Sequence, residues 1–259
     1  MSEKKIIFLD WDDTLFFTHV HDYIEIIPIE QKLFAQYIDN LYAFLEYIVS
    51  KGRVIIVTNG SVGWVMNGCC EKYPQLKNIF DKLNIELISA RDRYSQLYPK
   101  EYVKWKELTF KSILDEYKNN NIHVISIGDS NDERIAVWHT TGINVHCVKK
   151  VDDITYTIPK KNIKTSSLKL IRKPTFNILL NEIKLLKDFW VNLLLDSNIE
   201  CDYIIDSNYN MIFVNGIINM EELWMKPVLC IVPRINITRS IHYNLRKRKI
   251  NEIIDEIIV

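Results

Sequence analysis

Three carboxylates lie within four residues near the start of the chain, where Asp10, Asp12 and Asp13 follow the apolar run 6–9. Carboxylates crowded in this way repel one another, and their pKa values rise unless a cation or a solvated turn relieves the repulsion. One interpretation of the cluster is an exposed acidic turn after a strand. The other is a site that holds a cation, and the rest of the sequence decides between them.

Two more polar clusters follow apolar, β-branched runs. The run 53–57 precedes Thr58 and Asn59, and the run 123–127 precedes Gly128 and Asp129. In a parallel sheet, ligands bind beyond the carboxyl ends of the strands, so we expect these clusters to meet at one edge. Three unrelated turns in this arrangement would be a coincidence, and the sequence therefore favours a functional site.

Apolar runs alternate with segments of helical spacing along the first 150 residues. This alternation predicts an α/β fold in which helices cover both faces of a parallel sheet. The predicted strands are 5–9, 53–57, 85–89, 123–127 and 144–148. The predicted helices are 29–50, 62–82, 100–118 and 132–139.

Composition excludes several classes of protein. The 259 residues include 33 basic and 33 acidic side chains, so no global field attracts nucleic acid or an anionic membrane. No apolar run has the length of a membrane span, and the N-terminus lacks the apolar core of a signal peptide. The five cysteines are odd in number and match no zinc-ligand spacing. We therefore expect a cytoplasmic protein with reduced thiols and no membrane partner.

The polar clusters resemble the motifs of the haloacid dehalogenase (HAD) superfamily of phosphohydrolases. The resemblance spans roughly residues 4–175 and rests on D-x-D-x-T-L at 10–15, a strand ending in Thr58, a lysine, and G-D-x-x-x-E at 128–133. Stretches within 58–64, 88–91 and 98–106 are similar to little-characterised HAD-like proteins of protists, algae and large viruses. The resemblance implies a HAD-like Rossmannoid three-layer fold of the uncapped type.

The chemistry of phosphate esters explains these residue types. Because an anion must approach an anion, a catalyst supplies a positioned nucleophile and a counter-charge. Asp10 resembles the nucleophile that forms an aspartyl-phosphate, and Asp12 resembles the general acid and base. Asp10, the backbone carbonyl of Asp12, and Asp129 would hold Mg2+, a hard ion that prefers oxygen ligands. Thr58 and the backbone amides around Asn59 would hydrogen-bond the phosphoryl oxygens.

Lys106 is the lysine that geometry selects as the counter-charge. Four lysines lie in the first twelve positions of the predicted helix 100–118, and only Lys106 shares the apolar face of Val103 and Phe110. A lysine on a core-facing stripe needs an anion, which the phosphate with Asp10 would provide. The alternative is a side chain whose ammonium group reaches water.

Two acids compete for the last position of the fourth motif. We expect Glu133 to orient a metal-bound water or the lysine without binding the metal directly. Asp132, its neighbour, is the competing choice.

Spacing predicts a site without a folded cap. About twelve residues, 16–27, follow the first motif, and one helix, one strand and a loop fill the interval between Thr58 and Lys106. An open site favours phosphate groups on macromolecules. We expect a catalytic core at 1–175 and a small α+β appendage at 176–259. The tail would contain a helix at 175–195, a hairpin at 203–214 and a helix at 238–258.

These expectations describe a Mg2+-dependent phosphomonoester hydrolase that acts on an exposed phosphate of a protein or nucleic acid. A polynucleotide 3'-phosphatase is an alternative, supported by the basic segment 160–173 and weakened by the zero net charge. A catalytically silent scaffold or regulator is the other. The complete set of predicted site residues argues against the silent scaffold. The sequence does not predict the substrate or the oligomeric state.

Overall fold

The computed structural model describes residues 3–21, 29–117, 121–142, 162–197 and 201–213. The strand predicted at 144–148 and the helix predicted at 238–258 lie outside these residues. Residues 22–27, half of the segment 16–27 that follows the first motif, also lie outside them.

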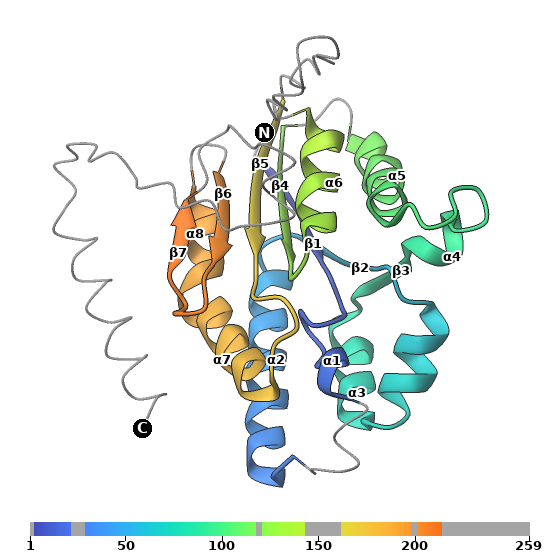
Figure 1. Ribbon diagram of the computed structural model, residues 1–259. Coiled ribbons are helices and arrows are strands. Elements are labelled where there is room, and N and C mark those ends of the chain that lie inside the picture. Colours follow the sequence, from blue (N-terminus) through green and yellow to red (C-terminus); the bar gives the residue numbers. More distant parts are fainter. Residues whose placement is uncertain (1–2, 22–28, 118–120, 143–161, 198–200, 214–259) are drawn as a thin grey trace, which may run out of the picture. The chain divides into compact units, whose positions relative to one another are not determined.

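A seven-stranded sheet runs through the described part of the chain, in the order β3-β2-β1-β4-β5-β6-β7 (Figure 1). Strands β1 to β6 pair in parallel, and β7 pairs antiparallel with β6. The strands are β1 (Lys4–Leu9), β2 (Arg53–Thr58), β3 (Glu86–Ser89), β4 (Ile122–Gly128), β5 (Ile163–Lys169), β6 (Cys201–Ile205) and β7 (Met211–Phe213). The predicted α/β fold with a mostly parallel sheet is therefore confirmed, and β1 to β4 lie within one residue of their predicted ends.

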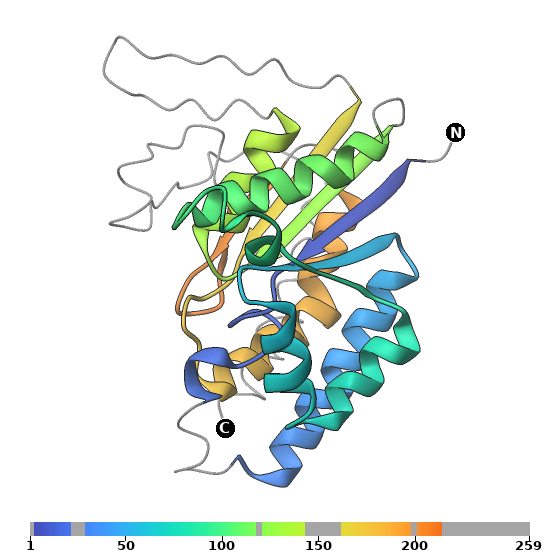
Figure 2. The same cartoon turned by 90° about the vertical axis from the view of Figure 1, so that its right-hand side faces the viewer.

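Helices cover both faces of this sheet (Figure 2). One face carries α4 (Ala90–Tyr94), α5 (Tyr102–Leu114) and α6 (Asn131–Thr141). The other carries α2 (Gln31–Val49), α3 (Pro74–Leu83), α7 (Phe176–Leu185) and α8 (Val191–Asp196). Shorter elements are α1 (Thr18–His21), the π-helical segments η1 (Trp64–Cys70) and η3 (Leu186–Trp190), and the 3-10 turn η2 (Asp115–Tyr117). Among the described residues, none of these helices has the length and apolar character that a membrane span requires.

Packing between α5 and β1 determines where the helix lies along the strands. Phe8 of β1 stacks on Phe110 of α5, with ring centroids 4.1 Å apart, and both side chains are buried. The start of α5 lies beside the end of β2, where the Asn59 amide bonds the Tyr102 carbonyl. Helix α5 therefore begins at the carboxyl edge of the sheet and runs toward the amino edge.

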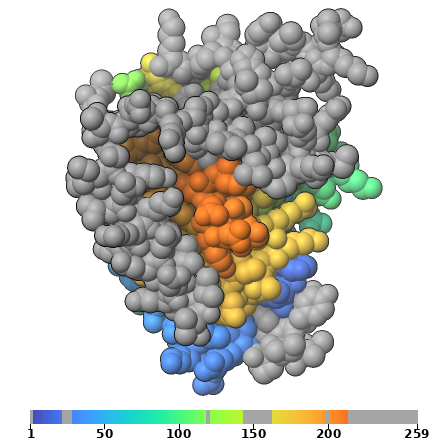
Figure 3. All heavy atoms as spheres, turned by 60° about the vertical axis from the view of Figure 1, so that its left-hand side comes forward, coloured from blue at the N-terminus to red at the C-terminus, as the bar shows by residue number. Residues whose placement is uncertain are grey.

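The sheet continues past the domain boundary predicted at residue 175. Strand β6 pairs with β5 from Ser166 to Lys169, and α7 packs against α2. Residues 201–213 lie beside residues of the 163–185 stretch on one face of the molecule (Figure 3). The predicted helix at 175–195 is present as α7, η3 and α8, and the predicted hairpin is β6 with β7.

Candidate active site

The carboxyl ends of β1, β2 and β4 bring the predicted polar clusters to one edge of the sheet. The Asp10 N–H donates to the Ile127 carbonyl at 2.9 Å, which extends the ladder between β1 and β4 by one residue. Thr58 is the last residue of β2, and Asp129 directly follows β4. Backbone pairing, rather than a flexible loop, therefore holds Asp10 in place.

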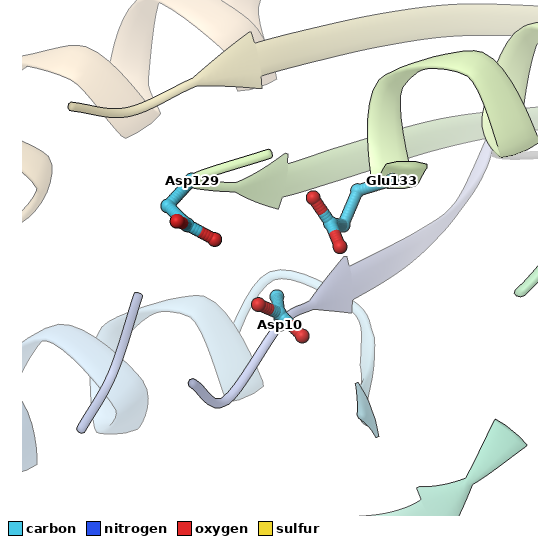
Figure 4. Close-up of side chains that lie close together, drawn as sticks. All are labelled: Asp10, Asp129 and Glu133. Atoms are coloured by element: carbon cyan, nitrogen blue, oxygen red, sulfur yellow. The ribbon is translucent and has the colours of Figure 1, made fainter. Parts of the chain in front are cut away.

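Asp10, Asp129 and Glu133 form an acidic cluster at this edge. Each offers one carboxylate oxygen, and these oxygens all lie within 4.8 Å of one another. All three side chains are buried, and their carboxylates face a common space (Figure 4). The sequence placed Glu133 beside the metal ligands, whereas the structure brings its carboxylate into the cluster itself. Asp132, the competing acid, is not a member.

The turn after β4 aims Glu133 at the cluster. Ser130 caps α6: its hydroxyl accepts from the Asp132 N–H at 3.0 Å, while Glu133 Oε2 accepts from the Ser130 N–H and hydroxyl at 3.1 and 2.6 Å. This capping box folds the glutamate side chain back toward the strand. Gly128 makes room, because a Cβ there would lie 2.5 Å from the Glu133 Cγ.

Lys106 reaches the cluster from α5. Its Nζ donates to Asp10 Oδ1 at 2.6 Å and also to Glu133, and the residue is 1% exposed. The register follows from the Phe8–Phe110 stack: Asp10 lies two strand residues beyond Phe8, about 6.6 Å. Lys106 lies four helical residues before Phe110, about 6.0 Å in the same direction. The apolar stripe therefore places the lysine as predicted, while Lys104 remains partly exposed.

Burial and mutual repulsion change the pKa values of the acids in the cluster. Burial raises the pKa of Asp10 well above its usual range, despite the attraction of Lys106. Burial, followed by the Glu133 charge, raises the pKa of Asp129 to about 7. For Glu133 burial acts in the same direction, but the charge and hydrogen bond of Lys106, together with the hydrogen bond from Ser130, outweigh it and the pKa is lowered. Burial alone would lower the pKa of Lys106, yet the two carboxylates that it contacts raise it.

The cluster fits a hard divalent cation. When all three carboxylates are ionised, the Lys106 ammonium group, which contacts two of them, leaves an excess of two negative charges in this buried cluster. The donors are all oxygens, which Mg2+ and Ca2+ prefer. A divalent ion would cancel this excess and keep Asp10 and Asp129 ionised.

The Asp12 carboxylate lies outside this cluster and accepts three hydrogen bonds. The Thr18 hydroxyl and the Trp64 indole N–H donate to Oδ1, both at 2.8 Å. The Thr58 hydroxyl donates to Oδ2 at 2.8 Å. These donors come from three different elements, so the side chain is held in one orientation. Its backbone carbonyl remains the predicted metal ligand.

The side chains of Thr58 and Asn59 contact protein groups in the structure. The Thr58 hydroxyl donates to Asp12 and accepts from the Gly60 N–H at 2.8 Å. The Asn59 amide donates to the Tyr102 carbonyl at 3.4 Å. Both residues lie at the predicted edge, and their contact with a phosphoryl group stays a prediction.

Asp13, the third acid of the opening cluster, belongs to a turn. It has a positive φ of 55°, and its N–H donates to the Phe16 carbonyl at 2.7 Å, so the chain reverses there. Its carboxylate accepts from the exposed His19 N–H at 2.6 Å. Asp13 therefore lies in a turn as in the first interpretation, but its side chain is half-buried and burial raises its pKa, while Asp10 belongs to the buried cluster.

Sequence reasoning missed two residues that organise the site. The Thr14 hydroxyl accepts from the Asp129 N–H at 3.0 Å and lies 3.4 Å from Asp10 Oδ2, which ties the first motif to the fourth. Its place inside D-x-D-x-T was the available signal. Trp64, the donor to Asp12, lies in the stretch 58–64 that carries part of the resemblance, but nothing in its spacing from Thr58 indicates a contact with the first motif.

Comparison of the chain with protein-family models, curated proteins and solved structures finds no match.

Proposed function

We propose that this chain is a Mg2+-dependent phosphomonoester hydrolase of the HAD type that works through an aspartyl-phosphate on Asp10. The observation that supports it best is the contact of Asp10 with Lys106 inside a buried acidic cluster at a strand end. A structural ion pair needs no excess of carboxylates, and a simple metal site needs no buried lysine. A carboxylate, a fixed cation and a site for a divalent ion are together the groups that phosphoryl transfer uses.

The proposed reaction has two halves. An Asp10 carboxylate oxygen attacks phosphorus, the bond to the leaving oxygen breaks, and Asp12 gives that oxygen a proton. Asp12 then takes a proton from the water that attacks the aspartyl-phosphate, which releases inorganic phosphate and restores Asp10. Lys106 supplies fixed positive charge beside Asp10 throughout.

A bound Mg2+ would supply further positive charge at the phosphoryl oxygens. Asp10, Asp129 and the backbone carbonyl of Asp12 would hold it, with the Glu133 carboxylate in the same cluster.

The substrate that we propose carries its phosphate on a macromolecule. Between Thr58 and Lys106 the chain forms only η1, α3, β3 and α4, which leaves no room for an inserted cap domain. An uncapped site cannot enclose a small metabolite by itself.

A polynucleotide 3'-phosphatase is the specific alternative. Arg172 and Lys173 are exposed just beyond β5, close enough to Asp132 and Asp13 to interact electrostatically. Cations at the rim of the site would suit a backbone of several phosphates.

A substrate panel tests this proposal. Purified chain is assayed with Mg2+ against p-nitrophenyl phosphate, a phosphopeptide, a 3'-phosphorylated oligonucleotide and a sugar phosphate. We expect turnover that EDTA stops, that Mg2+ restores, and that Asp10→Asn lacks. Preference for the oligonucleotide would select the alternative. No turnover of any ester with Mg2+ would support a silent scaffold and contradict the proposal.

A further inference from the structure

Trp64 is an aromatic side chain that donates a hydrogen bond to a proposed catalytic carboxylate. Its indole Nε1 donates to Asp12 Oδ1 at 2.8 Å, across 52 positions of sequence. Trp64 is the first residue of η1, and π-helical turns occur often at functional sites.

Close packing fixes the indole ring. A Cβ on Gly60 would lie 2.9 Å from its Cδ1, and a Cβ on Gly68 would lie 2.6 Å from its Cε3. Both glycines therefore lie directly against the ring. His21 and Phe16 meet it edge to face, with centroids 5.5 and 6.3 Å away. The N–H consequently has one direction in which to point.

The three donors to Asp12 are not equivalent. The hydroxyls of Thr58 and Thr18 rotate, and each can accept a hydrogen bond as well as donate one. The indole N–H of Trp64 can only donate, so Oδ1 must remain an acceptor whether or not Asp12 carries a proton. The carbonyl oxygen of a carboxylic acid is a better acceptor than its hydroxyl oxygen. The bond from Trp64 therefore favours the proton of the acid form on Oδ2, where the Thr58 hydroxyl can turn to accept it.

We infer that Trp64 is a positioning residue that orients Asp12 and assigns its transferable proton to Oδ2. The inference rests on the proposed function, because it concerns how Asp12 protonates the leaving oxygen. Asp12 gives the proton from Oδ2 as the bond to phosphorus breaks, and Oδ1 keeps its bond from the indole.

Leaving-group dependence tests this role. Trp64→Phe keeps an aromatic ring and removes the N–H. The variant is assayed with p-nitrophenyl phosphate, whose leaving group needs little protonation, and with an alkyl phosphate, whose leaving group needs it. We compare kcat/KM because it reports only the first half of the reaction. We expect a loss on the order of 100-fold for the alkyl ester, at the low end of general acid catalysis, and a much smaller loss for the nitrophenyl ester.

Two variants separate positioning from stability. Gly68→Ala keeps the indole N–H but displaces the ring. It should therefore also lower kcat/KM more for the alkyl ester than for the nitrophenyl ester. Trp190→Phe, which alters a buried tryptophan in η3, should lower kcat/KM equally for the two esters or leave it unchanged. Equal losses on the two esters for Trp64→Phe would mean that Trp64 only supports the fold, and would overturn the inference.

A measurement without turnover tests the contact itself. The indole N–H resonance of Trp64 is assigned by its loss in Trp64→Phe and is then followed in Asp12→Asn. We expect the resonance to move, because the neutral amide is a weaker acceptor than the carboxylate. An unmoved resonance overturns the inference alone. Failure of the wild-type chain to cleave either ester overturns the proposed function and the catalytic role together.

Discussion

Lys106 Nζ lies 2.6 Å from Asp10 Oδ1, although 96 positions of sequence separate the two residues. Their side chains are 1% and 6% exposed, so the pair is removed from water. Removal of one member of such a buried pair leaves the other charge without compensation, which is strongly unfavourable. The packing of α5 therefore determines whether the buried Asp10 has a counter-charge.

Replacement of this lysine should be far more damaging than replacement of its neighbour. Lys106→Ala removes the charge beside Asp10 and should lower kcat/KM about 100- to 1,000-fold, or about 2.7 to 4 kcal/mol, by analogy with the loss of one oxyanion donor. Lys104→Ala alters a partly exposed side chain whose pairing with Glu107 contributes little, and should change kcat/KM less than about twofold. A large loss at Lys104 with normal activity at Lys106 would contradict the helix phase.

Affinity for Mg2+ should rise with pH. Burial and the Glu133 charge raise the pKa of Asp129 to about 7, and burial raises that of Asp10. Because an acid must lose its proton before it binds a metal, binding should strengthen between about pH 6 and about pH 8. Titration calorimetry with Mg2+ across this range measures the effect.

Asp129→Asn is the matched variant for this prediction. It should weaken binding and reduce its pH dependence, since the amide has no proton to lose at these pH values. Binding of equal strength at both ends of the range in the wild-type chain would argue against a cation held by these carboxylates.

Glu182 should make the fold less stable as the pH rises. It is fully buried in α7, its Oε1 accepts from the Ile171 N–H at 2.8 Å, and burial raises its pKa from 4.5 to about 8. The folded state therefore favours the neutral acid. Its contribution to the free energy of unfolding is fully present below about pH 4.5 and is lost as the pH rises to about 8.

Glu182→Gln tests this prediction, because the amide keeps an acceptor for the Ile171 N–H and carries no charge. The free energy of unfolding, measured by chemical denaturation at several pH values, should fall less with pH in the variant than in the wild-type chain. Glu101→Gln, which changes an exposed acid, should leave the pH dependence as it is. Equal slopes in the wild-type and Glu182→Gln proteins would show that Glu182 is already ionised in the fold.

The sequence predicted the edge of the sheet and the lysine because both depend on local periodicity. The apolar, β-branched runs before Asp10, Thr58 and Asp129 mark the strand ends directly. The position of Lys106 follows from the 3.6-residue repeat of one helix. Neither inference needed a contact between distant segments.

The sequence did not predict strand β5, because the hydrogen-bond partners of its buried polar residues lie far away in the sequence. Its central residues, 165–167, are polar and buried, which gives no apolar run to detect. The Ser167 hydroxyl donates to Asp202 at 2.5 Å, and the Ser166 hydroxyl lies 2.7 Å from His123 Nε2. A buried hydroxyl costs free energy when it lacks such a partner, and the linear sequence does not show which residues will meet.

The membership of Glu133 in the acidic cluster was also beyond the sequence. The S-x-x-E pattern at 130–133 is a recognisable capping box, but the direction of the glutamate depends on the space above Gly128 and on Lys106. Tertiary packing therefore decides between Glu133 and Asp132.

Chemical trapping of the intermediate tests the central claim most directly. Asp12→Asn should slow hydrolysis of the aspartyl-phosphate, so this variant is mixed with Mg2+ and p-nitrophenyl phosphate, quenched in acid, digested and mapped by mass spectrometry. We predict one phosphoryl group on Asp10, absent from the matched Asp10→Asn protein, which should remain folded. The covalent mechanism would be contradicted if the wild-type chain turns over substrate but Asp12→Asn yields no phosphorylated Asp10. Activity of Asp10→Asn at the wild-type rate would contradict it as well.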